Sequence, residues 1–120
     1  MEIKTFRDLI AWQKAMELAR HIYQTITQMP DAERFGLTAQ MRRAAVSIPS
    51  NIAEGHGRHS LPDYIRFLKV ARGSLMELQT QLILAQDLDF IRPATELTNL
   101  HAETDRVLQG LIRSLENLPK

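Results

Sequence analysis

The spacing of apolar residues in the second half of the chain is the feature that most constrains its fold. Between Tyr64 and Ala85 the apolar side chains recur at alternating intervals of four and three residues, at Tyr64, Leu68, Ala71, Leu75, Leu78, Leu82 and Ala85. This spacing places them on one face of a single helix. Ser60 precedes the pattern as an N-cap, with Asp63 at the capping-box position. We therefore expect a long helix from about Leu61 to Leu88.

Three further segments repeat this pattern and predict helices over about residues 6–29, 37–55 and 93–118. Four helices with wide apolar faces and short connections are typical of a four-helix bundle. We expect an all-α fold, an up-down-up-down antiparallel bundle forming one domain over residues 1–120. Its three other apolar faces comprise Leu9, Trp12, Met16, Ala19, Tyr23 and Ile26; Leu37, Met41, Ala44, Ile48 and Ile52; and Leu97, Leu100, Thr104, Val107 and Leu111.

The second predicted helix carries two unusual features. Pro49 lies inside it, and because proline lacks the amide donor and pushes against the carbonyl of Ala45, a kink is expected there. At ~100° per residue, one flank is also lined with polar side chains. We expect them to form a structural polar network with Ser74 and Glu77, where Gly73 would permit close approach of another group. The network comprises Gln40, Arg43, Ser47, Asn51, Glu54, Ser74 and Glu77.

Composition excludes several classes of function. The chain has no cysteine, so thiolate metal sites and disulfides are absent. No apolar run is long enough to span a membrane, and the charged start resembles no secretory signal, so a cytoplasmic location is expected. No carboxylate is followed by histidine at the Glu-x-x-His spacing of dinuclear metal bundles, and Glu17–His21 is better explained as a surface pair. We expect no catalysis, no cofactor and no metal.

Basic side chains are concentrated in the middle of the chain although the net charge is only +1. The segment from Arg42 to Arg72 contains six basic residues and only two acidic ones. Solvated helix faces would explain this pattern, and so would a surface for nucleic-acid phosphates. On the second reading the expected contacts are Arg42, Arg58, Arg66, Lys69 and Arg72. Ala45, Val46 and Ala53 lie off the main apolar face, which indicates either self-association or a broad core.

Three stretches of the chain resemble one bacterial family. They are FRDLIAWQKA, PDAERFGLTAQMRRAAVSIPSNIAEG and YIRFLKVARGSLMELQTQL. The family comprises four-helix-bundle proteins encoded by intervening sequences of large-subunit ribosomal RNA genes, and the accessory variability proteins of diversity-generating retroelements are similar. The resemblance implies a homopentameric ring. For the retroelement relatives it implies binding of nucleic acid and of a reverse transcriptase. The matching signature residues are Gln40, Arg43, Ser47, Asn51, Glu54, Gly73, Ser74 and Glu77.

These observations predict a non-catalytic, ring-forming bundle that binds RNA or DNA weakly and without sequence specificity. In a pentamer the basic surfaces of five copies would add, which favours attraction of a nucleic-acid backbone. The alternative is a protein-interaction scaffold in which the basic residues only keep the surface soluble.

Overall fold

The computed structural model describes residues 2–119, and within that range every regular element is helical. Four α-helices form an elongated body of 49 × 25 × 21 Å. Short 3₁₀ turns precede and follow the first helix. In chain order the elements are η1 (Phe6–Asp8), α1 (Ile10–Thr25), η2 (Ile26–Gln28), η3 (Asp31–Glu33), α2 (Leu37–His56), α3 (Leu61–Asp87) and α4 (Thr95–Glu116). The predicted all-helical fold with four helices is confirmed.

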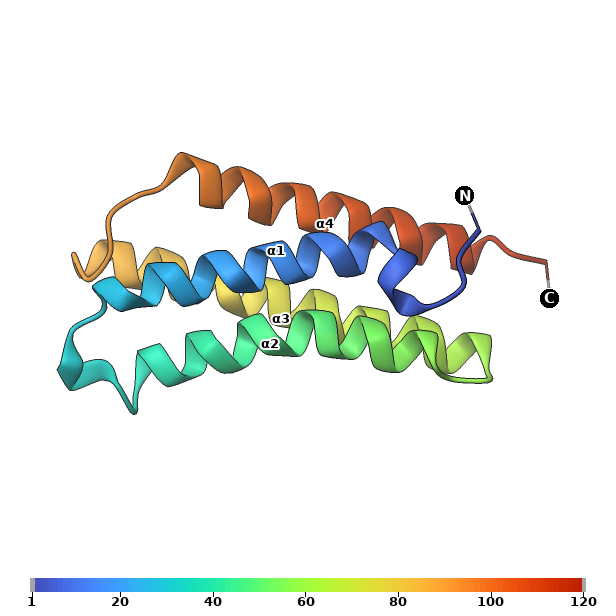
Figure 1. Ribbon diagram of the computed structural model, residues 1–120, viewed down its shortest axis with the longest axis horizontal. Helices are drawn as coiled ribbons and strands as arrows, with labels where there is room; N and C mark the ends of the chain where they lie inside the picture. The colour runs from blue at the N-terminus through green and yellow to red at the C-terminus, as the bar shows by residue number, and fades with distance from the viewer. Residues whose placement is uncertain (1, 120) are drawn as a thin grey trace.

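Successive helices run in opposite directions along the body, so that both termini lie at the same end (Figure 1). The principal packing pairs are α1 with α2, α2 with α3, α3 with α4, and α4 back onto α1. Each helix thus has two main neighbours, and the buried apolar side chains form one central cluster. The connection between α1 and α2 lies at the end opposite the termini (Figure 1).

Local signals set the ends of α3. The Ser60 hydroxyl accepts a hydrogen bond from the Asp63 amide at 3.2 Å, as the sequence predicts for an N-cap. At the other end, Asp89 adopts a left-handed conformation with φ of 59°. The amides of Asp89 and Phe90 then donate to the carbonyls of Gln86 and Ala85. This is a Schellman arrangement with aspartate in the place that glycine usually takes.

The apolar faces predicted for α2 and α3 are confirmed. Every member is buried except Leu37 and Tyr64, which are half-buried. On α4 the buried face begins as predicted at Leu97, Leu100 and Thr104, then continues through Leu108 and Ile112. Val107 and Leu111, the predicted members, are half-buried. The shift arises because a straight helix has 3.6 residues per turn and drifts from a seven-residue repeat.

The apolar face predicted for α1 is wrong. The core side of α1 consists of Ala11, Ala15, Leu18 and Ile22, together with Leu9 just before the helix. Of the predicted residues other than Leu9, Tyr23 is 45% exposed and Trp12, Met16, Ala19 and Ile26 are half-buried. Two of these core positions are alanine, and the bulkier Trp12, Met16 and Tyr23 line a groove on the flank instead.

The close approach between helices occurs at Gly55 and not at Gly73, where the sequence suggested it. Nothing lies within 4 Å of the position of a Cβ added to Gly73, so the expected close approach at that glycine is wrong. A Cβ on Gly55 would instead meet the Phe67 Cβ at 2.8 Å and the Tyr64 carbonyl oxygen at 3.1 Å. Gly55 is inside α2, and it brings α2 against the first turns of α3. Pro49 is likewise inside α2 and buried; a bend there stays a prediction.

Candidate nucleic-acid interface

The polar flank of α2 forms a small hydrogen-bonded cluster with α3. The hydroxyls of Ser47 and Ser74 are 2.8 Å apart. The Asn51 side-chain amide donates both to the Ser47 hydroxyl, at 2.9 Å, and to the Ser47 carbonyl oxygen, at 2.8 Å. All three residues are half-buried. The structure thus brings together three members of the predicted polar network, one of them from the neighbouring helix.

The other four members of that network remain at the surface. Gln40, Arg43, Glu54 and Glu77 are exposed. Glu54 accepts a hydrogen bond from Arg58 at 3.0 Å. Within residues 2–119, Gln40, Arg43 and Glu77 have no side-chain hydrogen bond or ion pair, so neither Arg43 nor Asn51 is paired directly with Ser74 or Glu77. An exposed arginine with no carboxylate partner keeps its charge available to a ligand.

Four of the five predicted phosphate contacts are paired with carboxylates. Two of these pairs are local, Arg58–Glu54 at 3.0 Å and Arg66–Asp63 at 3.5 Å. Both guanidinium groups also lie over the Phe67 ring, each 4.6 Å from its centroid. These arginines therefore lie over the place where α3 packs against the end of α2. Glu54 and Asp63 partly compensate their charges.

The two other pairs bridge α3 and α4. Lys69 lies 3.1 Å from Glu116, and the Arg72 Nε lies 3.1 Å from Asp105. The second Asp105 oxygen accepts from Gln109 at 2.8 Å, and the Asp105 side chain is only 19% exposed. Exposed pairs such as Lys69–Glu116 are worth little individually. Even so, the carboxylates reduce the positive potential that the sequence predicted for this face.

The fifth predicted contact, Arg42, lies in a different environment. It lines an open groove of about 700 Å³ together with Arg34 and Arg43. None of these three arginines forms an ion pair within the part of the chain that the structure describes. Phe35 and Tyr23 line the same groove, with 87% and 45% of their surfaces exposed. We call the set Arg34, Phe35, Arg42, Arg43 and Tyr23 the α1–α2 end surface.

Two carboxylates lie near this surface. Asp31 lines a smaller adjoining hollow with Arg34 and Arg42, without forming an ion pair within 4.0 Å. Glu33 is engaged by the backbone, because its Oε1 accepts from the Leu37 amide at 3.2 Å at the start of α2. The α1–α2 end surface therefore retains a positive excess. Sequence reasoning found only Arg42 and Arg43 here, although the adjacent Arg34 and Phe35 were a basic–aromatic signal.

An apolar groove follows the flank between α1 and α2. It is lined mainly by Trp12, Met16, Ala19, Val46 and Ala53, with Arg20 at its edge. Val46 is 44% exposed, whereas the neighbouring Ala45 is fully buried. Of the residues that the sequence placed off the main apolar face, Ala45 thus belongs to the core, and Val46 and Ala53 line this groove.

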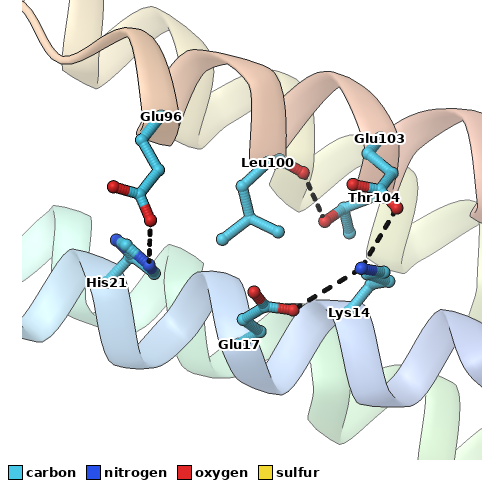
Figure 2. Close-up of polar contacts among 7 residues, drawn as sticks. All are labelled: Lys14, Glu17, His21, Glu96, Leu100, Glu103 and Thr104. Atoms are coloured by element: carbon cyan, nitrogen blue, oxygen red, sulfur yellow. Dashed lines mark hydrogen bonds and ion pairs between the residues drawn. The ribbon is translucent and has the colours of Figure 1, made fainter.

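Polar contacts join α1 to α4 on another flank (Figure 2). The Lys14 ammonium lies 3.0 Å from Glu103 and 3.7 Å from Glu17, and these hydrogen bonds and charges raise the pKa of Lys14. His21 lies 3.7 Å from Glu96, so the expected Glu17–His21 pair is absent and each residue has another partner. These charged residues are spread along α1 and α4, so their contacts hold the two helices together rather than converge on one point.

Other titratable groups likewise serve the fold. His101 is buried, and its Nε2 lies 2.8 Å from the Leu75 carbonyl oxygen. Desolvation raises the pKa of the half-buried Tyr64 hydroxyl above its ordinary value of 10.0. Among residues 2–119, no three His, Asp or Glu side chains are grouped so as to hold a metal ion.

Within residues 2–119 the architecture is that of an all-helical bundle of four α-helices. Residues 7–113 match the model of the 23S rRNA-intervening sequence protein family, and the chain belongs to that family. No match was found among curated proteins. Within residues 2–119, no helix is both long enough and apolar enough to cross a membrane.

Proposed function

We propose that the protein is a non-catalytic accessory protein that binds RNA or DNA weakly and without sequence specificity. The observation that carries the proposal is the group of three arginines, Arg34, Arg42 and Arg43, that line one groove without an ion-pair partner within residues 2–119. Arginine suits this role because its planar guanidinium binds phosphate oxygens through two parallel hydrogen bonds. Contacts of this kind provide affinity and carry no sequence information.

The main phosphate contacts are then Arg34, Arg42 and Arg43, which do not belong to α3. Arg58, Arg66, Lys69 and Arg72 remain secondary contacts, because each must exchange a carboxylate for a phosphate when nucleic acid binds. Assembly as a homopentamer, which the family resemblance implies, would bring five such surfaces into one ring and strengthen attraction of a polyanion. A reverse transcriptase is the protein partner that the same resemblance implies for the retroelement relatives.

The test is a fluorescence-anisotropy titration of labelled RNA and DNA at several salt concentrations. The variant Arg34→Glu/Arg42→Glu/Arg43→Glu is compared with Arg66→Glu/Lys69→Glu/Arg72→Glu and with the control Arg106→Glu, an exposed arginine on α4. We expect binding by the wild-type protein to weaken steeply with salt. The first triple variant should lose most of the affinity and about 2 units of the log–log salt slope on single strands. Equal binding by all four proteins would overturn the assignment.

A second variant tests the idea that carboxylates suppress binding on α3. Asp105→Asn removes the charge that faces Arg72 at 3.1 Å but keeps the side-chain shape. If Arg72 is a secondary contact, this variant should bind the same RNA more tightly than wild type at low salt. Unchanged affinity would remove Arg72 from the interface.

A protein-interaction role is the second candidate, and a specific observation favours it. The groove between α1 and α2 exposes part of Trp12, Met16 and Val46, which is apolar surface that the bundle itself does not cover. Apolar surface of this kind commonly marks a contact between proteins. Met16→Glu changes this groove at a half-buried position of α1 that does not line the arginine groove. Loss of assembly or of a partner in this variant, with RNA binding intact, would support that role.

A further inference from the structure

Phe35 is the most exposed large apolar side chain within residues 2–119, with 87% of its surface open to solvent. It lies between η3 and α2, one residue before Gly36, the N-cap of α2. An apolar residue at this position often packs against the fourth residue of the helix as a hydrophobic staple. Here that fourth residue is Gln40, which is polar and exposed. Helix capping therefore does not account for Phe35.

The surroundings of the ring suit a ligand that combines a flat apolar group with negative charge. The Arg34 guanidinium lies over the Phe35 ring, 5.3 Å from its centroid. Arg42 and Arg43 line the same groove of about 700 Å³, and Tyr23, 45% exposed, supplies a second aromatic side chain. Single-stranded nucleic acids have this combination, since the backbone is anionic and each unpaired base has a face that stacks on aromatic rings.

We infer that the α1–α2 end surface binds a single-stranded segment of RNA or DNA, with one base stacked on Phe35 and the adjoining phosphates held by Arg34, Arg42 and Arg43. This inference rests on the proposed nucleic-acid function and specifies its substrate class. In a duplex the bases stay stacked on one another, so only the phosphates can contact the α1–α2 end surface. The protein therefore discriminates single strands from duplexes without reading sequence.

The experiment measures the affinity of the full chain for a fluorescein-labelled 12-nucleotide single-stranded RNA, its DNA equivalent and a 12-base-pair RNA duplex at the same ionic strength. The variants are Phe35→Ala, Phe35→Trp, which retains a stacking surface, and Phe35→Leu, which retains apolar bulk without a ring. Circular dichroism checks that each variant stays folded, as expected for a side chain that is 87% exposed.

We expect Phe35→Ala and Phe35→Leu to weaken single-strand binding roughly 5- to 150-fold, the range that base–aromatic stacking supplies. Phe35→Trp should retain the affinity. The salt dependence should be unchanged in all three variants, because the phosphate contacts remain. Binding of the duplex should be weaker in wild type and insensitive to Phe35. Comparing the RNA with the DNA strand shows whether the 2′-hydroxyl adds to binding.

Each contrary outcome has a distinct meaning. If no nucleic acid binds even at low salt, the proposed function itself fails. If RNA binds but Phe35→Ala changes nothing, or weakens strand and duplex equally, the stacking inference is overturned while the proposed function stands. An acidic peptide that competes with the RNA, and whose own binding is lost in Phe35→Ala, would overturn the inference in favour of a protein partner at this surface.

Discussion

Gly55 on α2 lies so close to Phe67 on α3 that a methyl group added to the glycine would be 2.8 Å from the Phe67 Cβ. Contacts of this length between carbon atoms force neighbouring groups to move, and both positions belong to packed helices. The side chain that limits the approach is held in turn by Arg58 and Arg66, whose guanidinium groups lie over its ring. The absence of a side chain at Gly55 thus fixes how α2 meets α3.

The first prediction compares two glycine substitutions within helices. Gly55→Ala should lower the free energy of unfolding by roughly 1–3 kcal/mol, because the added methyl group overpacks the contact with Phe67. Gly73→Ala should raise it by up to about 1 kcal/mol, since alanine is the better helix former and nothing lies within 4 Å of the new Cβ. Urea denaturation measures both. A destabilised Gly73→Ala protein whose stability depends on its concentration would instead place Gly73 between copies.

The second prediction concerns the hydrogen bond between Ser47 and Ser74. Ser74→Ala should destabilise the protein by about 0.5–1.5 kcal/mol, because the remaining Ser47 hydroxyl is half-buried. Ser47→Ala should cost more, because the Ser47 hydroxyl also accepts from Asn51. The double variant should cost less than the sum of the two single changes. A double-mutant cycle from denaturation curves gives the coupling energy directly. Strict additivity would show that the two hydroxyls do not interact in solution.

The third prediction concerns buried oxygens without a partner. Thr38 Oγ1 and Gln81 Oε1 are buried and have no hydrogen bond among residues 2–119. Thr38→Val should therefore leave stability unchanged or raise it slightly, since no hydrogen bond is lost. Thr104→Val is the matched control, because the buried Thr104 hydroxyl donates to the Leu100 carbonyl at 2.7 Å, and it should cost roughly 0.5–1.5 kcal/mol. A clear loss in Thr38→Val would indicate a bound water.

The fourth prediction concerns pH. The amides of Lys4 and Thr5 donate to the Asp8 carboxylate and lower its pKa below the ordinary value of 3.8. A depressed pKa means that this cap stabilises the folded state above pH 3.8 and that its contribution is lost as the pH falls through the lower folded-state pKa. NMR titration of the Asp8 carboxyl should give a midpoint below 3.8. Asp8→Asn should remove the pH dependence of the η1 amide signals, and an Asp8 midpoint at or above 3.8 would contradict the capping interaction.

The apolar spacing predicted the four helices, but it predicted the buried face correctly for α2 and α3 and wrongly for α1. On α3 the unbroken alternation of four- and three-residue steps identified the buried face, although Val70, Ile83 and Leu84 on the same helix are apolar and exposed. On α1 two apolar faces compete, and spacing does not indicate that the small residues Ala11 and Ala15 face inward while Trp12 and Tyr23 line the flank. That choice depends on how closely α2 and α4 approach, which is a property of the assembled bundle.

The candidate site was less predictable for the same reason. Charge counting identified Lys69 and Arg72 as free cations, but their carboxylate partners, Glu116 and Asp105, lie on another helix far along the chain. The contribution of Arg34 and Phe35 also escaped pattern analysis, because a connection between helices has no periodicity. Only the folded chain brings these two residues to the same groove as Arg42 and Arg43.

The placement of Arg58 also affects how the chain meets a protease. The connection between α2 and α3 is short, glycine-containing and exposed, features that usually invite cleavage. A trypsin-like enzyme needs an arginine side chain that can leave its own protein and enter a deep pocket. Arg58 is held by Glu54 and by the Phe67 ring, so its side chain must leave both partners before it can enter such a pocket. At Arg34 no carboxylate has to be released within residues 2–119, and the ring beneath the guanidinium, Phe35, is itself exposed.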